Sequence, residues 1–316
     1  MVDYQLSQIA IMHHENGLSQ QEIAHLLGFS KMTVSRMLQK AKEQGIIQTG
    51  VLLPFELDNA LGKSLQRQFD LQQVWVMKND NPDAEIAVSR ETLAKAAAFT
   101  VNTNPPGNST IGIGIGRTVG QFVRHLSPLK TENVHVVQLM GGLPDVTKEN
   151  PFTIIQETCR KWDAAGTFLT SFATAENKDA RERFFENTDI GRGIYKLWTQ
   201  CDTAVFGIGT IEKGTLLSPS LVGTEEIEKL KLLNAVGDVL GHCFDAAGNF
   251  VSSDLEDRLV AIPLDMLIKV PVRMAIAFGA YKVDALYAAL RTGVITKLFT
   301  DDCTASMLLH NKNLQR

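Results

Sequence analysis

The chain has 316 residues, enough for about two domains, and its 44% hydrophobic and 21% charged residues are typical of a globular protein. No run of about 18 apolar residues occurs and the start lacks the features of a signal peptide, so we expect no membrane span and a cytoplasmic location. The net charge of −4 excludes a generally basic protein, so any nucleic-acid binding must come from a local patch.

The cysteines are scattered along the chain, with no Cys-x-x-Cys pair among them. We expect buried free thiols rather than disulfides or a zinc site. The four residues concerned are Cys159, Cys201, Cys243 and Cys303.

Residues 19–45 have the pattern of a helix-turn-helix. Ser19 and Glu22 predict a capping box at the start of a first helix. Gly28 is expected to end that helix with a positive φ, and Ser30 to cap a second helix. The apolar residues that would pack the two helices together are Ile23, Ala24, Leu27, Phe29, Val34, Met37, Leu38 and Ala41.

The outer face of the second helix is basic, because four basic residues and no acidic one lie between Lys31 and Lys42. In helix-turn-helix motifs this face enters the major groove of DNA. A plain helical hairpin is the alternative, but the caps, the small Ala24 and the corner glycine together favour DNA binding. The residues predicted to contact DNA are Ser30, Lys31, Met32, Ser35, Arg36, Gln39, Lys40 and Lys42.

Three segments flank this motif. Residues 3–15 predict a preceding helix, and residues 46–54 predict a wing-like strand, which would make the domain winged. Residues 55–69 carry apolar side chains at helical spacing and predict a connector helix. Its apolar stripe is either a dimer seam or a surface that packs on its own domain. The stripe consists of Phe55, Leu57, Leu61, Leu65 and Phe69.

From Leu71 onwards, short apolar strands alternate with helices. Strands are predicted at 73–77, 110–115, 134–140, 166–170, 203–208, 272–278 and 296–300, and a hairpin at 245–251. Helices are predicted at 83–102, 117–127, 152–162, 178–187, 190–199, 224–232, 282–291 and 301–310. This alternation is typical of an α/β domain with a doubly wound, mostly parallel sheet. We therefore expect a DNA-binding domain at 1–54, a connector helix at 55–70 and a large domain at 71–316.

A glycine-rich turn links the strand that begins near Ser109 to the following helix. Gly114 and Gly116 would permit close backbone approach, Arg117 would supply a bidentate positive charge and Thr118 a hydroxyl group. Together with the positive end of the helix dipole, these groups predict a phosphate site. The turn matches neither the dinucleotide-binding fingerprint nor a P-loop, so a tight turn without a ligand is the alternative.

Other loops at predicted strand ends favour a ligand site. Gly141 and Gly142 follow one strand, and residues 207–210 follow another. Lys282 opens a helix, where a cation is unfavourable unless it pairs with a ligand phosphate or an acid. Asp238 supplies a carboxylate suited to accepting hydrogen bonds from sugar hydroxyls.

The order of these motifs resembles the SorC family of bacterial sugar-responsive transcription regulators. The resemblance rests on the helix-turn-helix, on IGIGIGRTV (111–119), on AVGDVLGHCFDAAGNFV (235–251), on the helix led by Lys282, and on LFTDDCTA (298–305). It covers essentially the whole chain.

The resemblance implies an effector domain similar to sugar-phosphate isomerase and deaminase folds, and no enzyme activity. It also implies a phosphorylated sugar or polyol as effector, no cofactor, and a homodimer or homotetramer on operator DNA. Carried over to this chain, the glycine loop with Arg117 and Thr118 would hold the phosphate, and Asp238 and Lys282 would meet the sugar and its phosphate. Phe278 departs from the family pattern of a small residue or glycine before Gly279 and predicts a narrower or differently shaped pocket.

Two other interpretations stay open. A sugar-phosphate isomerase or deaminase would need an acid–base pair in the pocket, for which Asp238, His242 and Asp245 are the candidates. Alternatively, the large domain only oligomerises a DNA-binding protein.

Overall fold

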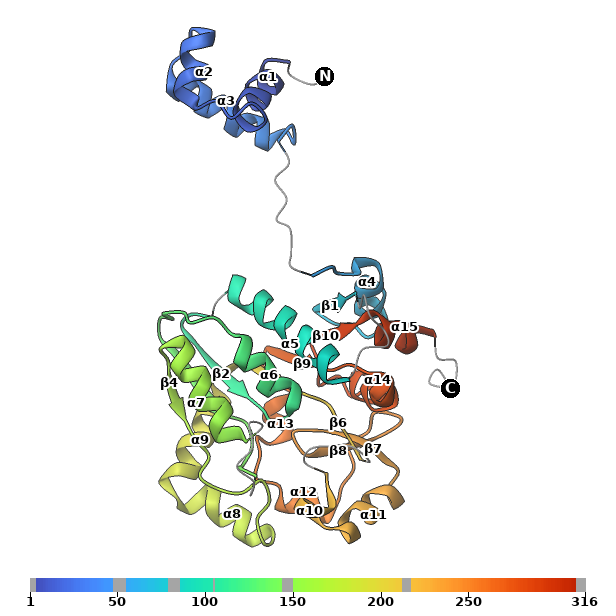
Figure 1. The fold of residues 1–316 in the computed structure, drawn as a ribbon. Helices are drawn as coiled ribbons and strands as arrows, with labels where there is room; N and C mark the ends of the chain where they lie inside the picture. The colour runs from blue at the N-terminus through green and yellow to red at the C-terminus, as the bar shows by residue number, and fades with distance from the viewer. Residues whose placement is uncertain are drawn as a thin grey trace. The chain divides into compact units, whose positions relative to one another are not determined.

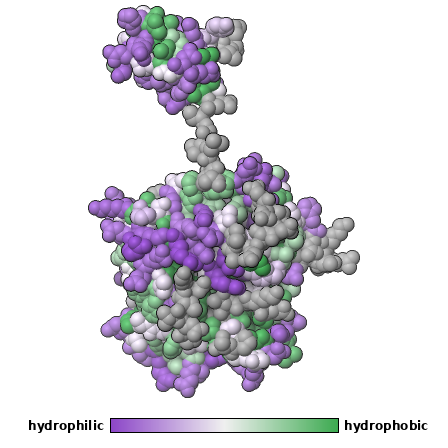
Figure 2. Space-filling view, in the orientation of Figure 1, coloured by the Kyte–Doolittle hydropathy of each residue, from purple (hydrophilic) through white to green (hydrophobic). Residues whose placement is uncertain are grey.

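The computed structural model describes most of the chain. Contacts divide it into two units, Met1–Pro54 and Phe55–Arg316 (Figure 1). The coloured part of the visible face of each unit combines hydrophilic patches with scattered apolar residues (Figure 2). No helix in the described part is long and apolar enough to cross a membrane. The described residues are 4–47, 55–78, 86–104, 106–143, 150–211 and 217–310.

Within residues 4–47, the first unit contains three helices, α1 (Tyr4–His14), α2 (Gln20–Leu27) and α3 (Lys31–Glu43). Their shared core consists of Ile9, Ile23, Ala24, Val34 and Leu38, with Met12, Leu18, Leu27, Phe29, Met37 and Ile47 packed against it. The predicted helices and their inner faces are therefore confirmed. The wing-like strand predicted at 46–54 lies, from residue 48 onwards, outside the described residues.

The caps of the helix-turn-helix are those expected from the sequence. The Ser19 hydroxyl accepts from the Glu22 N–H (3.3 Å), and the Glu22 carboxylate accepts from the Ser19 N–H (2.8 Å). Gly28 ends α2 with a φ of 71°. The Ser30 hydroxyl accepts from the Thr33 N–H at the start of α3 (3.1 Å). These local bonds fix the helix boundaries.

In the described part of the second unit, seven parallel strands form a sheet in the order β1-β10-β9-β5-β2-β3-β4. All seven were predicted. Several predictions ran two residues too far at the carboxyl end, because the buried, apolar sequence continues from the strand into the following loop. The strands are β1 (Gln73–Met77), β2 (Ser109–Ile113), β3 (Val134–Gln138), β4 (Ala165–Thr167), β5 (Cys201–Phe206), β9 (Val272–Ile276) and β10 (Lys297–Asp301).

Helices cover both faces of this sheet, which makes it doubly wound as predicted. On one face, α5 (Ile86–Thr103), α6 (Arg117–His125) and α7 (Pro151–Trp162) share a core and lie side by side (Figure 1). The other face packs a second core against the remaining long helices. These are α4 (Asn59–Gln68), α8 (Lys178–Asn187), α9 (Asp189–Thr199), α14 (Val283–Arg291) and α15 (Asp302–His310).

The helix expected at 55–69 begins later, because the Asp58 carboxylate caps α4 by accepting from two N–H groups of its first turn. Its apolar stripe packs on its own unit. Leu65 is fully buried, and Phe69 lies edge-on to Tyr287 with ring centroids 5.4 Å apart. Most of the stripe thus packs on the second unit, which favours the second of the two interpretations, while the dimer seam stays a prediction.

A small antiparallel sheet, which the sequence did not predict, joins β6 (Gly209–Thr210), β7 (Ala235–Val239) and β8 (His242–Asp245). The hairpin expected at 245–251 is confirmed by the bridge between Phe244 and Phe250. The helices around this sheet are α10 (Pro219–Val222), α11 (Thr224–Leu232), α12 (Asp254–Arg258) and α13 (Leu264–Leu267), of which only α11 was predicted.

The cysteines are free thiols, as expected, but not all are buried. Cys201 and Cys243 are buried and Cys159 is half-buried, whereas Cys303 is exposed in the first turn of α15. The prediction of a buried thiol was therefore wrong for Cys303. No cluster of three His, Cys, Asp or Glu side chains within the described ranges is arranged to hold a metal ion.

Candidate functional site

A cleft opens at the carboxyl ends of the central strands. The loops after β2, β3, β5 and β9 contribute to it, together with α5 and the β7–β8 hairpin. Ligands of open α/β sheets bind at this edge. The lining residues are Arg90, Ile115, Gly116, Arg117, Thr118, Met140, Gly207, Ile208, Gly209, Asp238, Leu240, Tyr281 and Lys282.

The start of α6 forms one wall of the cleft. Gly116 is the N-cap residue, with φ 126° and ψ 160°, a conformation that side chains rarely adopt. Because glycine has no side chain, it cannot cap the first-turn N–H groups of α6. Thr118 is buried in this turn, whereas Arg117 is exposed. The positive end of the helix dipole therefore faces the cleft beside a cationic side chain.

Lys282 lies at the end of a 3₁₀ turn, η1 (Ala280–Lys282), immediately before α14. Its ammonium donates to the Ile208 carbonyl (2.5 Å), and no carboxylate of the described residues is within ion-pair distance. Burial lowers the pKa of Lys282 to about 8. The positive charge of Arg117 adds to this effect and Asp238 opposes it. The structure therefore places a cation at the helix start without an acidic partner.

Asp238 faces the same cleft from strand β7 and is only 5% exposed. Its Oδ2 accepts from the Gly241 N–H (3.0 Å), but its Oδ1 has no hydrogen-bond partner among the described residues. Burial raises the pKa of Asp238, and the Gly241 bond and the charge of Lys282 oppose that rise. Oδ1 is thus a buried acceptor without a donor in the part of the chain that the structure describes.

Two residues near Asp238, Gly209 and Leu240, are tightly constrained. A Cβ atom on Gly209 would lie 1.9 Å from the Asp238 Oδ1, so that only glycine fits there. Leu240, in the turn between β7 and β8, has a φ of 52°, which is unusual for a bulky residue. Such backbone strain is found most often near functional sites.

Arg90, on α5, also lines the cleft, and sequence reasoning missed it. Its positive charge contributes to lowering the pKa of Lys282. Its local sequence carries no signal of this position, because Arg90 lies in the second turn of α5 and reaches the cleft only through the packing of that helix. Among the described residues, the cleft therefore gathers three cations, Arg90, Arg117 and Lys282, and one carboxylate, Asp238.

Five predicted effector-site residues line the cleft, but Gly114, Gly141 and Gly142 do not. The N–H groups of these three glycines donate to backbone carbonyls at 2.7–2.8 Å. A Cβ on Gly114 would lie 2.5 Å from the Leu240 side chain, and one on Gly141 would lie 2.2 Å from the Phe172 carbonyl. Close packing explains these glycines without a ligand.

Phe278 does not narrow the cleft, contrary to expectation. Its side chain is buried in the core shared by α5, α6 and α7, and it is not among the lining residues. Met140, Leu240 and Tyr281 provide the larger apolar side chains of the wall instead.

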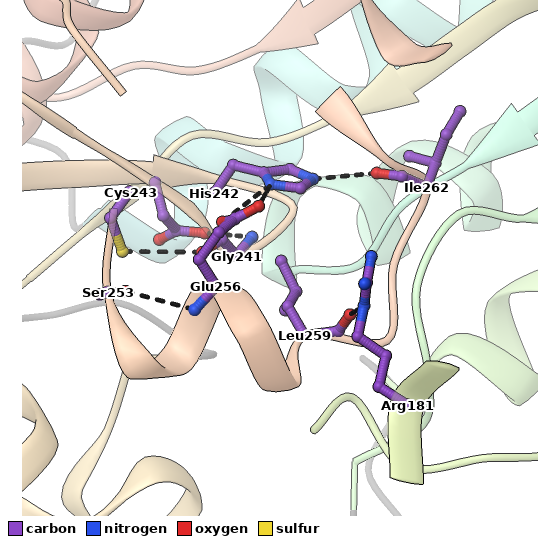
Figure 3. A network of polar contacts seen from close by, with 9 residues as sticks. Arg181, Gly241, His242, Cys243, Ser253, Glu256, Leu259 and Ile262 are labelled. Carbon is purple, nitrogen blue, oxygen red and sulfur yellow. Dashed lines mark hydrogen bonds and ion pairs between the residues drawn. The ribbon is translucent and has the colours of Figure 1, made fainter. Parts of the chain in front are cut away.

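The other acid–base candidates have structural partners (Figure 3). The His242 Nδ1 lies 2.9 Å from the Glu256 Oε1, and its Nε2 lies 2.9 Å from the Ile262 carbonyl. These contacts tie the β7–β8 hairpin to α12 and to the segment that follows it. The Asp245 carboxylate accepts from the N–H of Asn249 (2.9 Å) and holds a turn. Neither side chain lines the cleft.

The predicted DNA-contacting face of α3 is exposed. Met32 is 66% exposed at its start, whereas Val34, Leu38 and Ala41 point into the core. Gln39 donates to the Glu43 carboxylate (3.1 Å) across one helical turn. All eight residues predicted to contact DNA are exposed.

Comparison with known proteins assigns both units. Residues 54–310 match the Sugar-bind family of sugar-binding domains, and residues 7–54 match a Crp-like helix-turn-helix domain. The chain is 30% identical to the deoxyribonucleoside regulator of Bacillus subtilis (strain 168), and the match covers 96% of each chain. Its fold is similar to that of the full-length sorbitol operon regulator SorC from Klebsiella pneumoniae, with a TM-score of 0.73 and 23% identity over 96% of this chain and 98% of that one. The chain belongs to the SorC family of transcription regulators.

A further relative supports the assignment of this SorC-family chain. The transcriptional regulator LsrR of Escherichia coli (strain K12) is 28% identical, with 97% of this chain and 95% of LsrR covered. The resemblance seen in the sequence is thus confirmed. The protein is a transcription regulator that combines a helix-turn-helix with a sugar-binding domain. The Bacillus subtilis and Escherichia coli relatives both have names that describe them as regulators.

Proposed function

We propose that this SorC-family regulator binds operator DNA through α3, and that a phosphorylated sugar or polyol bound in the cleft changes its operator affinity. The observation that carries the proposal is the gathering of Arg90, Arg117 and Lys282 around the start of α6, with Asp238 in the same cleft. Charge and hydrogen-bonding capacity both support it.

A phosphate group fits the cationic part of the cleft. It carries a charge of about −1.5 to −2 at neutral pH and three acceptor oxygens. The N–H groups at the start of α6 provide donors and a favourable dipole for such an anion. Arg117 can add a bidentate hydrogen bond, and Lys282 a point charge that is hydrogen-bonded to the neutral Ile208 carbonyl and lies over the Tyr281 ring.

The sugar or polyol part fits the remaining wall. The Asp238 carboxylate lines the cleft and can accept a hydrogen bond from a ligand hydroxyl. An uncharged, hydroxyl-rich ligand could make this contact alone, but it would gain nothing from the positive charges that line the cleft. We therefore favour the phosphorylated form.

The effect on DNA follows from linkage. A ligand shifts a conformational equilibrium only by the difference between its affinities for the two states. Coupling free energies are typically about 1–3 kcal/mol, so the effector should change operator affinity by roughly 5- to 150-fold.

The active form on DNA is expected to be a homodimer or homotetramer. The first 50 residues carry four basic and four acidic side chains, so one copy of the basic α3 face makes few phosphate contacts. Two copies would bind a near-palindromic operator with half-sites separated by whole turns of DNA. Sedimentation that finds a monomer bound tightly to its operator would contradict this part of the proposal.

A melting-temperature screen tests the effector site. Sugars and polyols would be compared in phosphorylated and unphosphorylated forms against the wild type, Lys282→Gln and Arg117→Ala. A ligand at 100 times its dissociation constant stabilises by about 2.7 kcal/mol, which such a screen detects readily. Lys269→Gln is the matched control, because its exposed side chain lies outside the cleft.

The expected result is stabilisation by phosphorylated ligands only, retained in Lys269→Gln and lost in the two cleft variants. Equal stabilisation by the unphosphorylated forms would refute the phosphate assignment. A turnover assay with the same compounds separates regulation from isomerase or deaminase activity.

A further inference from the structure

The turn that carries Lys282 is hydrogen-bonded to helix α15. The Gly279 N–H donates to the Thr304 Oγ1 at 2.7 Å, and Thr304 is fully buried in the first turn of α15. Gly279 has a φ of 103° and is the N-cap of η1, which ends at Lys282. The Lys282 N–H in turn donates to the Gly279 carbonyl (2.9 Å). Thr304 therefore fixes the residue at which the Lys282 turn starts.

The Thr304 side chain is itself held by Asp301, the last residue of β10. The Asp301 Oδ1 accepts from the Thr304 N–H (2.7 Å). Burial raises the pKa of Asp301, and hydrogen bonds from the side chain and the backbone of Thr304 oppose that rise. The hydroxyl thus donates its proton to the Asp301 carboxylate and presents its oxygen to Gly279. Because Thr304 is inaccessible to solvent, water cannot replace the Gly279 N–H as the donor.

Helix α15 also packs on α4. Ala305 and Leu308 of α15 are fully buried in the same core as Leu65 of α4, and Leu61 and Leu309 pack against that core. The two helices lie side by side (Figure 1). In chain order, α4 is the next described helix after the first unit, which contains the helix-turn-helix. One helix therefore contacts both the Lys282 turn and the helix that follows the DNA-binding unit in the sequence.

We propose that Thr304 is a positioning residue for Lys282, and that α15 transmits effector binding from the cleft to α4. The inference rests on the proposed function, because its trigger is a phosphate bound in the cleft. Such a phosphate competes with the Ile208 carbonyl for the Lys282 ammonium, and the short turn from Gly279 moves with that side chain. Helix α15 follows, because separating Gly279 from Thr304 would leave a buried oxygen without its donor. Packed cores shift between discrete arrangements, so a small movement of α15 changes its packing on α4.

Hydrogen exchange followed by mass spectrometry, on the full-length chain with inorganic phosphate, tests this coupling. Sodium chloride of equal ionic strength is the reference. Phosphate should slow exchange in the first turn of α6 and alter it in α15 and α4. Thr304→Val removes the hydroxyl and nearly keeps the shape of the side chain. It should weaken phosphate binding by roughly two- to tenfold, as for the loss of one hydrogen bond, and abolish the change in α4 even at saturating phosphate.

Two further variants separate the role of this hydroxyl from a general loss of stability. Thr304→Ser keeps the hydroxyl and should restore the change in α4. Thr158→Val should behave like the wild type, because it removes an equally buried hydroxyl that bonds only to Ile154 of its own helix, α7.

A change in α4 that persists in Thr304→Val would overturn the inference but not the proposed function. So would a wild type in which phosphate protects α6 and leaves α4 unchanged, a result that does not depend on how well the variants fold. Failure of phosphate to protect α6 in the wild type would refute the proposed function and this inference with it.

Discussion

Binding of a phosphorylated effector should weaken as the pH rises above about 8, because Lys282 then loses its proton. Burial, assisted by Arg117, lowers the pKa of Lys282 to about 8. A bound phosphate would raise that pKa again, so ligand and proton bind together. The association constant should therefore fall by up to about tenfold, or 1.4 kcal/mol, for each pH unit above 8. Below about pH 6 it should fall again, as the phosphate takes up a proton.

The stability of the ligand-free protein should change in the opposite direction. The pKa of Lys282 in the folded state lies below its ordinary value of 10.5. The unfolded chain therefore binds more protons between these two values, and the contribution of Lys282 to the free energy of unfolding rises with pH through this window.

Isothermal titration calorimetry at a series of pH values between about 6 and 9.5 measures the ligand effect. Lys282→Gln should bind weakly at pH 7 and lose the decline above pH 8, whereas Lys269→Gln should behave like the wild type. A wild-type affinity that stays constant from pH 7 to 9.5 would refute the role of Lys282. A decline that persists in Lys282→Gln would do the same.

Four further substitutions have defined outcomes. Asp238→Asn should raise the melting temperature of the ligand-free protein, because it removes a buried charge, and should weaken sugar binding; a lower melting temperature would contradict this. Gly209→Ala should cost about 1–3 kcal/mol in urea unfolding, because its Cβ would overlap the Asp238 carboxylate; an unchanged midpoint would contradict this. Ser30→Ala removes the cap on the Thr33 N–H and should lower stability by about 1 kcal/mol, measured by thermal melting of the first unit. Arg36→Ala should cost about 1–3 kcal/mol of operator binding and relax the preference at one base position; an unchanged binding-site selection would argue against base contact.

Local rules predicted the helix-turn-helix well. The Ser19–Glu22 capping box and the Gly28 cap depend on residues within one helical turn of each other, so the sequence displays them directly. The strands of the large sheet were visible for a similar reason, since a buried parallel strand is a short apolar run. Their carboxyl ends were placed too late, because loop residues such as Ile115 and Phe278 are also buried.

Features that depend on distant residues could not be predicted. Strand β7 contains Gly237 and Asp238, which are poor strand formers, and it pairs with a segment far away in the sequence. Gly141 looked like part of a binding loop, but the approach of Phe172 requires it. Arg90 reaches the cleft from α5, and nothing in its local sequence shows where α5 packs.

The most direct test of the central claim is operator binding with and without effector. A labelled operator, obtained by selection from genomic DNA, would be titrated with the protein and followed by fluorescence anisotropy. We predict that a phosphorylated sugar changes the dissociation constant by roughly 5- to 150-fold, and that Lys282→Gln still binds the operator but no longer responds. An equal response to the unphosphorylated sugar, or a full response in Lys282→Gln, would contradict control through a phosphate bound in this cleft.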